Sequence, residues 1–314
     1  MSWLQHEAVL AVQGIDAAKF LQGQITCDVL KLPEPGSVLG ARCTPKGRMQ
    51  SSFRLLREDQ QTYLLAMDAE LLAAQLAELG KYAVFFKTKL SDASQHWVRL
   101  GLWGEQAEAA LQQVGLTPPA TQDAVTSSSS GLAVNLGQQC FELWLPVETA
   151  LPSIRLLANT ASPTSLAHWR LQQIRRGAGE VCAATSESFI PQMLNLQLFD
   201  GVSFKKGCYT GQEIVARMQY LGKLKRRMFR FRIDASAPPP SAGTPILNNL
   251  NGQSVGEVVL SASDGEATEL LAVMQIDAAQ LTTLCAGEAQ GPMLELVNLP
   301  YDSELAASEA ATEH

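Results

Sequence analysis

Residues 203–217 read SFKKGCYTGQEIVAR. Two lysines precede a cysteine that stands between glycine and tyrosine, and apolar residues then follow at helical spacing. We therefore predict a loop that leads into a helix beginning near Gly211. Thr210 and Glu213 have the spacing of a capping box, in which each side chain accepts a hydrogen bond from the backbone N–H of the other residue.

Cys208 is the candidate reactive residue of this stretch. It precedes the predicted helix, whose N-terminus carries the positive end of the helix dipole. Lys205 and Lys206 add positive charge. Both effects favour the thiolate, so we expect the pKa of Cys208 to lie below the roughly 8.5 of a free thiol. A buried, inert cysteine in a well-capped loop is the alternative, and the local sequence leaves both open.

Positive charge is concentrated in one segment of an acidic chain. The protein has 314 residues and a net charge of -7. Nine basic residues lie between Lys205 and Arg232, where Glu213 is the only acid. Such a segment can bind an anionic ligand, for example a polyglutamate tail, a phosphate or RNA. A solvated basic face is the alternative, and both interpretations stay open.

Length and composition indicate a globular protein of two or three domains. Hydrophobic residues make up 46% and charged residues 18% of the chain. There is no uninterrupted apolar run as long as a membrane span. The first ten residues, MSWLQHEAVL, lack the basic and apolar regions of a signal peptide. We therefore expect a cytoplasmic protein without a membrane partner.

The cysteines and histidines do not form a metal-binding pattern. None of the six cysteines is at C-x-x-C spacing, and the four histidines are isolated. These spacings argue against a zinc ribbon, a ferredoxin-type cluster and a histidine metal centre, so we assign no metal ligand. The glycine-rich loops that bind nucleotide phosphates are also missing from the sequence, which disfavours nucleotide hydrolysis and NAD chemistry.

The first hundred residues mix strands and helices in an α+β pattern, without the βαβ units of a doubly wound sheet. We predict strands at 7–12, 37–43, 48–57, 62–67, 83–87, 97–104, 132–136, 140–146, 253–260, 269–276 and 293–298. We predict helices from Asp16 to about Leu21 and at 69–80, 105–114, 147–158 and 165–176. Gly80 is expected to end the second helix, and 126–131 is expected to be a flexible loop.

Several blocks of this sequence match one known family. The most specific is KGCYTGQE at 206–213. The others are FLQGQITCDV at 20–29, CTPKGRMQSSFRL at 43–55, ELGKYAVFFK at 78–87, FIPQMLNLQ at 189–197, VSFKK at 202–206 and NLPY at 298–301. With these blocks the chain resembles the YgfZ family, bacterial folate-binding proteins of iron–sulfur cluster metabolism. That family is related to the T-protein, the aminomethyltransferase of the glycine cleavage system.

The resemblance implies an α+β fold of three subdomains around a central channel that binds a tetrahydrofolate. Two ferredoxin-like α+β units, interleaved in sequence, would form a folate-binding region at residues 1–233. A C-terminal β-barrel would follow at 234–302. The remaining residues, 303–314, would be an acidic tail.

The resemblance also implies roles for single residues. Glu213 would bind the pterin ring of the folate, because a carboxylate can accept two hydrogen bonds from its 2-amino and N3–H edge. Cys208 would be the reactive residue, through thiolate coordination or redox exchange, and Lys206 would tune it. Further folate-binding residues are expected in the motif and near it: Gln192, Asn195, Tyr209, Gln212, Arg217 and Arg227.

Two departures from the T-protein pattern shape the functional prediction. T-proteins generally lack a cysteine at the position of Cys208. They carry an aspartate in the second hairpin strand, where this chain reads KGRMQSSFRL at 46–55 without an acid. Aminomethyl transfer thereby loses its expected catalytic group.

We therefore expect a folate-dependent accessory protein in the assembly or repair of iron–sulfur clusters. Its partners would be iron–sulfur enzymes or cluster carriers, including enzymes that thiomethylate tRNA. A one-carbon transferase that uses tetrahydrofolate and a tRNA-binding module that uses residues 205–232 are the alternatives. The sequence leaves the folate form, the reaction of Cys208 and the oligomeric state open.

Overall fold

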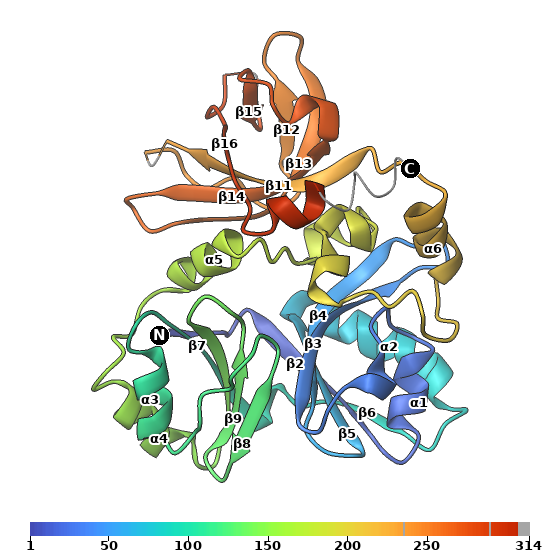
Figure 1. Ribbon diagram of the computed structural model, residues 1–314, viewed down its shortest axis with the longest axis vertical. Coiled ribbons are helices and arrows are strands. Elements are labelled where there is room, and N and C mark those ends of the chain that lie inside the picture. Colours follow the sequence, from blue (N-terminus) through green and yellow to red (C-terminus); the bar gives the residue numbers. More distant parts are fainter. Residues whose placement is uncertain (235, 289, 307–314) are drawn as a thin grey trace. The chain divides into compact units, whose positions relative to one another are not determined.

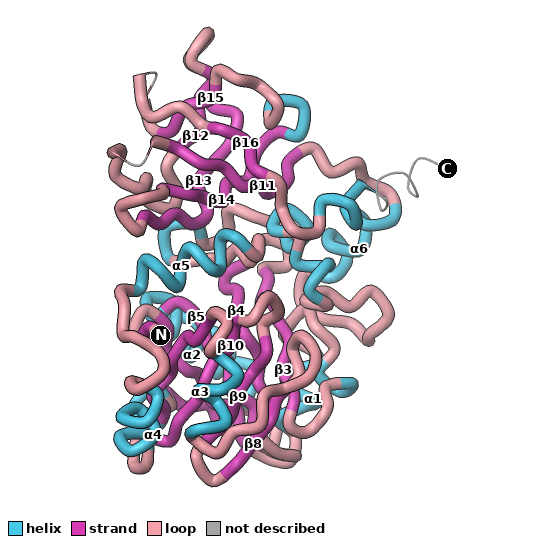
Figure 2. The backbone as a smooth tube through the Cα atoms, turned by 60° about the vertical axis from the view of Figure 1, so that its left-hand side comes forward, coloured by secondary structure: helices cyan, strands magenta, loops and turns pink. Residues whose placement is uncertain are grey.

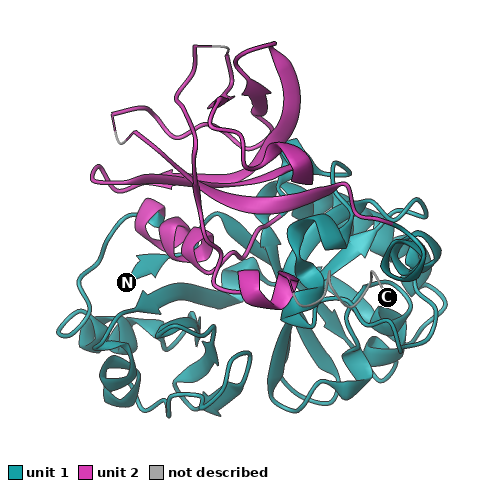
Figure 3. Cartoon of the chain, turned by 45° about the horizontal axis from the view of Figure 1, so that its top comes forward, with its two compact units in different colours: residues 1–166, 181–222 teal, residues 167–180, 223–314 magenta. Residues whose placement is uncertain are grey.

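The computed structural model describes residues 1–234, 236–288 and 290–306, which fall into two compact units (Figures 1 and 3). Unit 1 comprises Met1–Leu166 and Val181–Gly222. Unit 2 comprises Ala167–Glu180 and the described residues from Lys223 onward. Within the described ranges, no helix is both long and apolar enough to cross a membrane.

The first sheet of unit 1 is antiparallel and has the strand order β3–β4–β5–β2–β6. Helices α1 and α2 pack against one face of it (Figure 1). The strands are β2 (Glu7–Gln13), β3 (Gly36–Cys43), β4 (Met49–Arg57), β5 (Thr62–Asp68) and β6 (Lys89–Asp92). The helices are α1 (Ala17–Gln22) and α2 (Leu72–Ala83).

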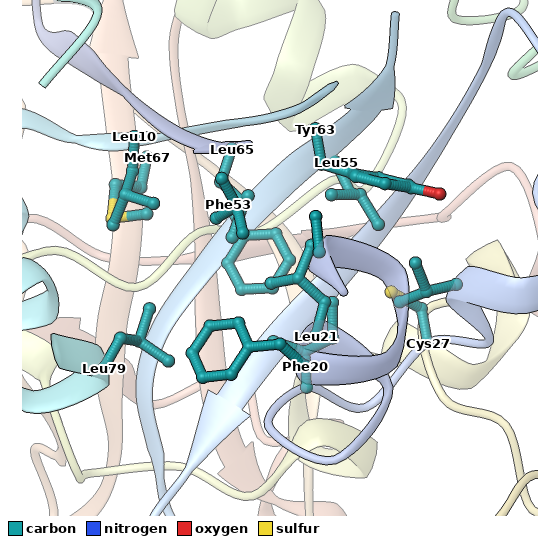
Figure 4. Close-up of a cluster of buried hydrophobic side chains, with 14 of the residues drawn as sticks. Leu10, Phe20, Leu21, Cys27, Phe53, Leu55, Tyr63, Leu65, Met67 and Leu79 are labelled. Carbon is teal, nitrogen blue, oxygen red and sulfur yellow. The ribbon is translucent and has the colours of Figure 1, made fainter. Parts of the chain in front are cut away.

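The core of this subdomain follows from the alternation of side chains along its strands. Phe53 and Leu55 of β4 point towards the helices and pack with Phe20 of α1 and Leu79 of α2 (Figure 4). Each such buried side chain stabilises the fold by about 1.5–3 kcal/mol. Arg54 lies between two core residues and therefore faces the opposite side of the sheet.

The second sheet of unit 1 has the strand order β1–β7–β10–β9–β8, and α3 and α4 pack on one face of it. Strand β1 precedes the first sheet in the sequence but pairs with β7, so the chain contributes a strand to the second sheet before it forms the first. The strands are β1 (Ser2–Trp3), β7 (Trp97–Trp103), β8 (Val125–Ser128), β9 (Gly131–Asn135) and β10 (Cys140–Pro146). The helices are α3 (Ala107–Gln113) and α4 (Ala150–Leu157).

Ion pairs between buried side chains connect the two sheets of unit 1. Arg54 of β4 pairs with Asp123 at 2.6 Å and approaches Glu142 of β10 at 3.7 Å. Arg99 of β7 binds the other oxygen of Glu142 at 3.0 Å and also pairs with Glu7 of β2. Glu142 therefore stands between two arginines from different sheets, and Arg99 between two glutamates.

This arrangement shifts the titration of Glu7. Burial alone would raise the pKa of Glu7, but the charge of Arg99 and its hydrogen bond hold the pKa below the usual 4.5. A carboxyl group with a depressed pKa stabilises the fold above its unfolded pKa, and this contribution is lost as the pH falls through the folded pKa. Glu7 therefore contributes to acid unfolding below pH 4.5.

Unit 2 contains one antiparallel sheet, with the order β15–β12–β13–β14–β11–β16, that curls into a half-barrel (Figures 1 and 2). Buried Glu269 of β14 pairs with Arg230 of β11 at 2.6 Å and with Arg175 of α5 at 3.0 Å. The strands are β11 (Arg226–Ile233), β12 (Pro245–Asn248), β13 (Gln253–Ser263), β14 (Thr268–Gln275), β15 (Leu284–Ala286) and β16 (Glu295–Val297). Helix α5 spans Leu166–Arg175.

The structure differs from the sequence-based expectation around the end of α2. Gly80 lies inside this helix, which continues to Ala83, because a single glycine costs a helix interior only about 1 kcal/mol. The predicted strand at 83–87 is wrong. Phe86 packs edge-on against Phe20, so this apolar run anchors a turn, and the next strand begins only at Lys89.

Three further segments depart from expectation. The predicted loop at 126–131 is largely occupied by strand β8, which pairs with β9. Strand β11 at 226–233 belongs to the C-terminal sheet, although the sequence places these residues in the preceding region. Of the predicted acidic tail at 303–314, residues 307–314 lie outside the described residues.

Removing Glu142 tests the charged contacts between the sheets. We expect Glu142→Ala to lower the free energy of unfolding by about 3–5 kcal/mol, because two buried guanidinium groups lose a counter-charge. Urea denaturation at neutral pH measures this change. Glu108→Ala, on the exposed side of α3, is the control and should change the free energy by less than about 0.5 kcal/mol. Equal effects of the two substitutions would contradict the prediction.

Candidate functional site

The motif at 203–217 forms a loop followed by helix α6 (Gln212–Tyr220), so the predicted helix start is confirmed to within one residue. Gly211 is the N-cap and has a φ of 87°, a left-handed conformation that glycine adopts without strain. A Cβ atom at Gly211 would lie 2.5 Å from the carbonyl oxygen of Thr44. A glycine is therefore required where the β3–β4 hairpin turn approaches the start of α6.

The predicted capping box is wrong. No side chain caps α6, and the backbone N–H of Thr210 donates to the carbonyl of Gly23 at 3.3 Å. That N–H was the expected partner of Glu213. Glu213 is instead an exposed carboxylate in the first turn of the helix, where the dipole favours negative charge.

Lys206 fixes the loop to the segment that follows α1. Its side chain is buried, and Nζ donates to the carbonyl oxygens of Ile25 at 2.8 Å and Cys27 at 2.7 Å. Nζ also lies 5.1 Å from the ring centroid of Tyr209, within the range of a cation–π contact. The contacts of Lys206 are therefore with residues 25–27 and with the ring that follows Cys208.

Burial dominates the electrostatics around Lys206. It lowers the pKa of Lys206 to about 8, against the opposing effects of Cys27 and Asp28. Burial also raises the pKa of Cys27 to about 12, although the charge of Lys206 opposes this shift. Cys27 is therefore a protonated thiol at neutral pH. The tuning of Cys208 by Lys206 stays a prediction.

Cys208 is the exposed thiol of the chain. Cys182 is half-buried, and the remaining cysteines, Cys27, Cys43, Cys140 and Cys285, are buried. No atom lies within 4 Å of the position that a Cβ would take at the neighbouring Gly207. The alternative of a buried Cys208 is therefore wrong, and the thiol is open to reagents and partners.

Two buried polar atoms near α6 lack hydrogen-bond partners among the described residues. Gln192 is 3% exposed and donates through Nε2 to the carbonyl of Val215 at 2.7 Å, which leaves its Oε1 without a donor. The hydroxyl of Tyr209 is the second such atom, and burial raises its pKa above the usual range. Unsatisfied buried polar atoms are uncommon in proteins, so each of these two atoms is free to bind a ligand or an ordered water.

The other predicted folate-binding residues take different positions. Asn195 is fully buried at a left-handed φ of 56°, and its N–H donates to the carbonyl of Gln192. Gln212 accepts from the N–H of Tyr209 at 3.3 Å through Oε1. Arg217 is exposed in the last turn of α6.

Arg227 and the second half of the basic segment belong to unit 2. The guanidinium of Arg227 lies 4.9 Å from the centroid of the Phe229 ring. Arg230 is held by Glu269. At least these two cations of the 205–232 segment thus have contacts inside the C-terminal sheet. Unit 1 contains all the other predicted site residues.

Thr26 is a positioning residue that the sequence analysis missed. Its hydroxyl donates to the carbonyl of Gly201 at 2.6 Å and accepts from the N–H of Ala41 at 2.9 Å. Its carbonyl accepts from the N–H of Ser203 at 2.9 Å. The only sequence signal was the position of this threonine between the apolar residues Ile25 and Cys27 in the FLQGQITCDV block.

Comparison with known proteins identifies the family. The chain is 36% identical over 280 residues to the tRNA-modifying protein YgfZ of Photobacterium profundum, which covers 83% of each chain. It is 34% identical over 299 residues to the protein of the same name from Yersinia pseudotuberculosis, covering 94% of this chain and 90% of that one. The chain belongs to the YgfZ family.

The fold of this YgfZ-family member is that of a T-protein. The GCVT N-terminal domain family matches residues 4–127. The crystal structure of the glycine cleavage system aminomethyltransferase T from Bartonella henselae superimposes with a TM-score of 0.75, covering 96% of this chain and 85% of that chain at 19% identity. The predicted T-protein-like fold is confirmed, with the third subdomain as a curled sheet.

Replacing Lys206 tests its structural role in the YgfZ motif. We expect Lys206→Met to lower the free energy of unfolding by about 1–3 kcal/mol, because the carbonyls of Ile25 and Cys27 lose their donor. Amide hydrogen exchange should also become faster at residues 203–211. Lys205→Met, at the exposed neighbouring lysine, is the matched control. If both variants exchange equally, Lys206 does not hold the loop.

Proposed function

We propose that this YgfZ-family protein binds a tetrahydrofolate and supports tRNA-modifying enzymes through the assembly or repair of their iron–sulfur clusters. The observation that carries the proposal is an exposed thiol, Cys208, on a loop that buried Lys206 holds in place beside the start of α6. The name of the relatives, tRNA-modifying protein, supports the link to tRNA.

The residues near α6 fit the hydrogen-bonding pattern of a pterin. A pterin offers donors at its 2-amino and N3–H edge and an acceptor at its carbonyl. Glu213 and the free Oε1 of Gln192 can accept, and the unsatisfied hydroxyl of Tyr209 can donate. A bound tetrahydrofolate would supply a carrier for one-carbon groups.

The second hairpin strand argues against aminomethyl transfer. Strand β4 reads MQSSFRLLR from Met49 to Arg57 and contains no carboxylate. Ser51 and Ser52 are buried in it, and the hydroxyl of Ser52 accepts from the N–H of Val181 at 2.7 Å. A serine hydroxyl in this role is no general base for a folate amine. The site therefore supports a different use of the T-protein fold.

Thiol chemistry at Cys208 suits a protein that handles iron–sulfur clusters. A thiolate coordinates iron, and an exposed thiolate also attacks disulfides through a mixed-disulfide intermediate. In this proposal the cluster is cargo. Cys208 is exposed just before α6, so its sulfur is accessible to a partner for either step.

Titration with tetrahydrofolate tests the ligand and its site together. We expect Glu213→Ala to weaken binding by about 10- to 100-fold, since a hydrogen bond to a charged group is worth about 1.5–3 kcal/mol. Isothermal titration calorimetry measures the dissociation constant. Glu108→Ala should bind as the unchanged protein does. If both variants bind tetrahydrofolate normally, Glu213 is not part of the site. If the unchanged protein does not bind tetrahydrofolate, the proposed folate binding is wrong.

Complementation of a deletion strain tests the thiol. We expect Cys208→Ala to leave iron–sulfur enzyme activity at the level of the deletion, because the exposed nucleophile is gone, while the protein still accumulates and folds. Cys182→Ala is the matched control at a half-buried cysteine and should restore activity. Full restoration by Cys208→Ala would exclude a central role for this thiol.

A further inference from the structure

A second surface of unit 1 exposes large apolar side chains. Phe85 is 81% and Val84 75% exposed in the turn after α2, and Tyr82 and Ile15 are also exposed. Large apolar side chains that gather in the open usually mark a binding surface. We name the group formed by Ile15, Tyr82, Val84 and Phe85 with three neighbouring lysines, Lys19, Lys87 and Lys89, the aromatic–lysine patch.

The exposure of Phe85 is fixed by the contacts of its neighbours. Phe86 packs inward against Phe20, with ring centroids 5.4 Å apart. The N–H of Lys87 donates to a carboxylate oxygen of Asp16 at 2.8 Å, which also holds the turn beside the start of α1. These contacts turn Phe86 into the core and leave Phe85 outside.

The same contacts bring Ile15 and the lysines to the patch. The hydroxyl of Thr88 donates to the carbonyl of Gln13 at 3.0 Å, and Lys89 pairs with Gln13 in the sheet. Residues 13–16 and 87–89 are therefore side by side. Lys19 lies in α1, which begins just after Ile15.

The patch is positively charged in an acidic protein. Lys19, Lys87 and Lys89 are exposed, and none of them forms an ion pair with a carboxylate in the described part of the chain. Lys81 is paired with Glu78, and the carboxylate of Asp16, which accepts the N–H of Lys87, leaves the three lysines in excess. These three cations remain available to an anionic partner, although the net charge of the protein is -7.

We propose that the aromatic–lysine patch binds a single-stranded segment of RNA. Bases stack on exposed aromatic rings, and the lysines neutralise the phosphates between them. Tyr82 and Phe85 provide the rings, and Lys87 and Lys89 follow them along the same exposed segment. The patch adjoins the N-terminal end of α1, whereas the Cys208 loop is fastened to the segment that follows α1. The proposal uses the proposed function only to choose tRNA as the probe.

The two exposed rings and the three lysines fit RNA, since bases stack on aromatic rings and phosphates bind lysines; an acidic protein and an anionic membrane are the competing partners. Those partners would bury the aliphatic side chains of Val84 and Ile15 as deeply as the rings. RNA would use the rings and the cations, and would gain little from Val84. Comparing Val84→Ala with Phe85→Ala therefore separates the kinds of partner.

Fluorescence anisotropy with an unmodified tRNA transcript and with a single-stranded oligoribonucleotide of one of its loops tests the patch. We expect Phe85→Ala to weaken binding of both probes by about tenfold and Phe85→Trp to retain it, because stacking needs an aromatic face. Lys87→Gln and Lys89→Gln should each reduce the slope of log K against log salt by about 0.7, the value for one phosphate of a single strand.

Two control variants make the test decisive. Val84→Ala changes the same turn without removing a ring, and Arg155→Gln removes an exposed cation from α4. Both should bind the RNA probes within about twofold of the unchanged protein. Equal loss in Val84→Ala and Phe85→Ala, or binding only to vesicles of anionic phospholipid, would overturn the proposal. So would RNA binding that no patch variant changes.

Titration with tetrahydrofolate distinguishes a failure of the RNA-binding proposal from a failure of the proposed function. Phe85→Ala should bind the folate as the unchanged protein does, because Phe85 is not part of the motif at 203–217. Glu213→Ala should bind the RNA probes normally. Loss of both ligands in both variants would mean that the substitutions disturb the fold, and thermal unfolding followed by circular dichroism detects that change directly.

Discussion

The buried pairing of Arg54 and Arg99 with Glu142 joins the two sheets of unit 1. Two α+β subdomains could each bury a helical face and still slide against one another. Charged groups away from water remove that freedom, because a shift of the sheets would separate Arg54 from Asp123 and Glu142, and Arg99 from Glu7. Glu7 and Asp123 complete the pairing and leave neither guanidinium with a single partner. Such contacts contribute less to net stability than to a unique arrangement.

The loop that carries Cys208 is held by the first sheet of unit 1 and the segment that follows α1. The segment at 181–222 returns to this sheet after the chain has formed the second one. Met49 exchanges backbone hydrogen bonds with residues 187 and 189, Thr26 binds residues 201 and 203, and Lys206 binds residues 25 and 27. Each contact joins a segment near the N-terminus to one about 140 to 180 residues later. The position of Cys208 is therefore a property of the folded unit.

Sequence patterns predicted most of the fold because local periodicity and turn residues specify single elements. The hairpin of β3 and β4 and the start of α6 follow from such signals. The same signals failed where contacts between residues far apart in the sequence decide the local structure. Phe86 belongs to a turn because Phe20 receives its ring, and Glu213 is no capping residue because Gly23, far away in the sequence, takes the N–H of Thr210. Motif matching singled out the loop at 203–217, but it could not show that Lys206 binds the carbonyls of residues 25 and 27.

Lys206 and Cys208 have opposite environments within the same loop. Lys206 is buried, and its contacts hold the loop. Cys208 is two residues further along and exposed. A thiol in the core, such as Cys27, has its pKa raised by burial and stays protonated. Cys208 is exposed on a loop that contacts of Lys206 and Thr210 hold to residues 23–27, so its sulfur is accessible and its position is defined. Gly211 in turn brings the start of α6 against Thr44 in the turn between β3 and β4, so the exposed thiol lies on a loop that leads directly into this close contact.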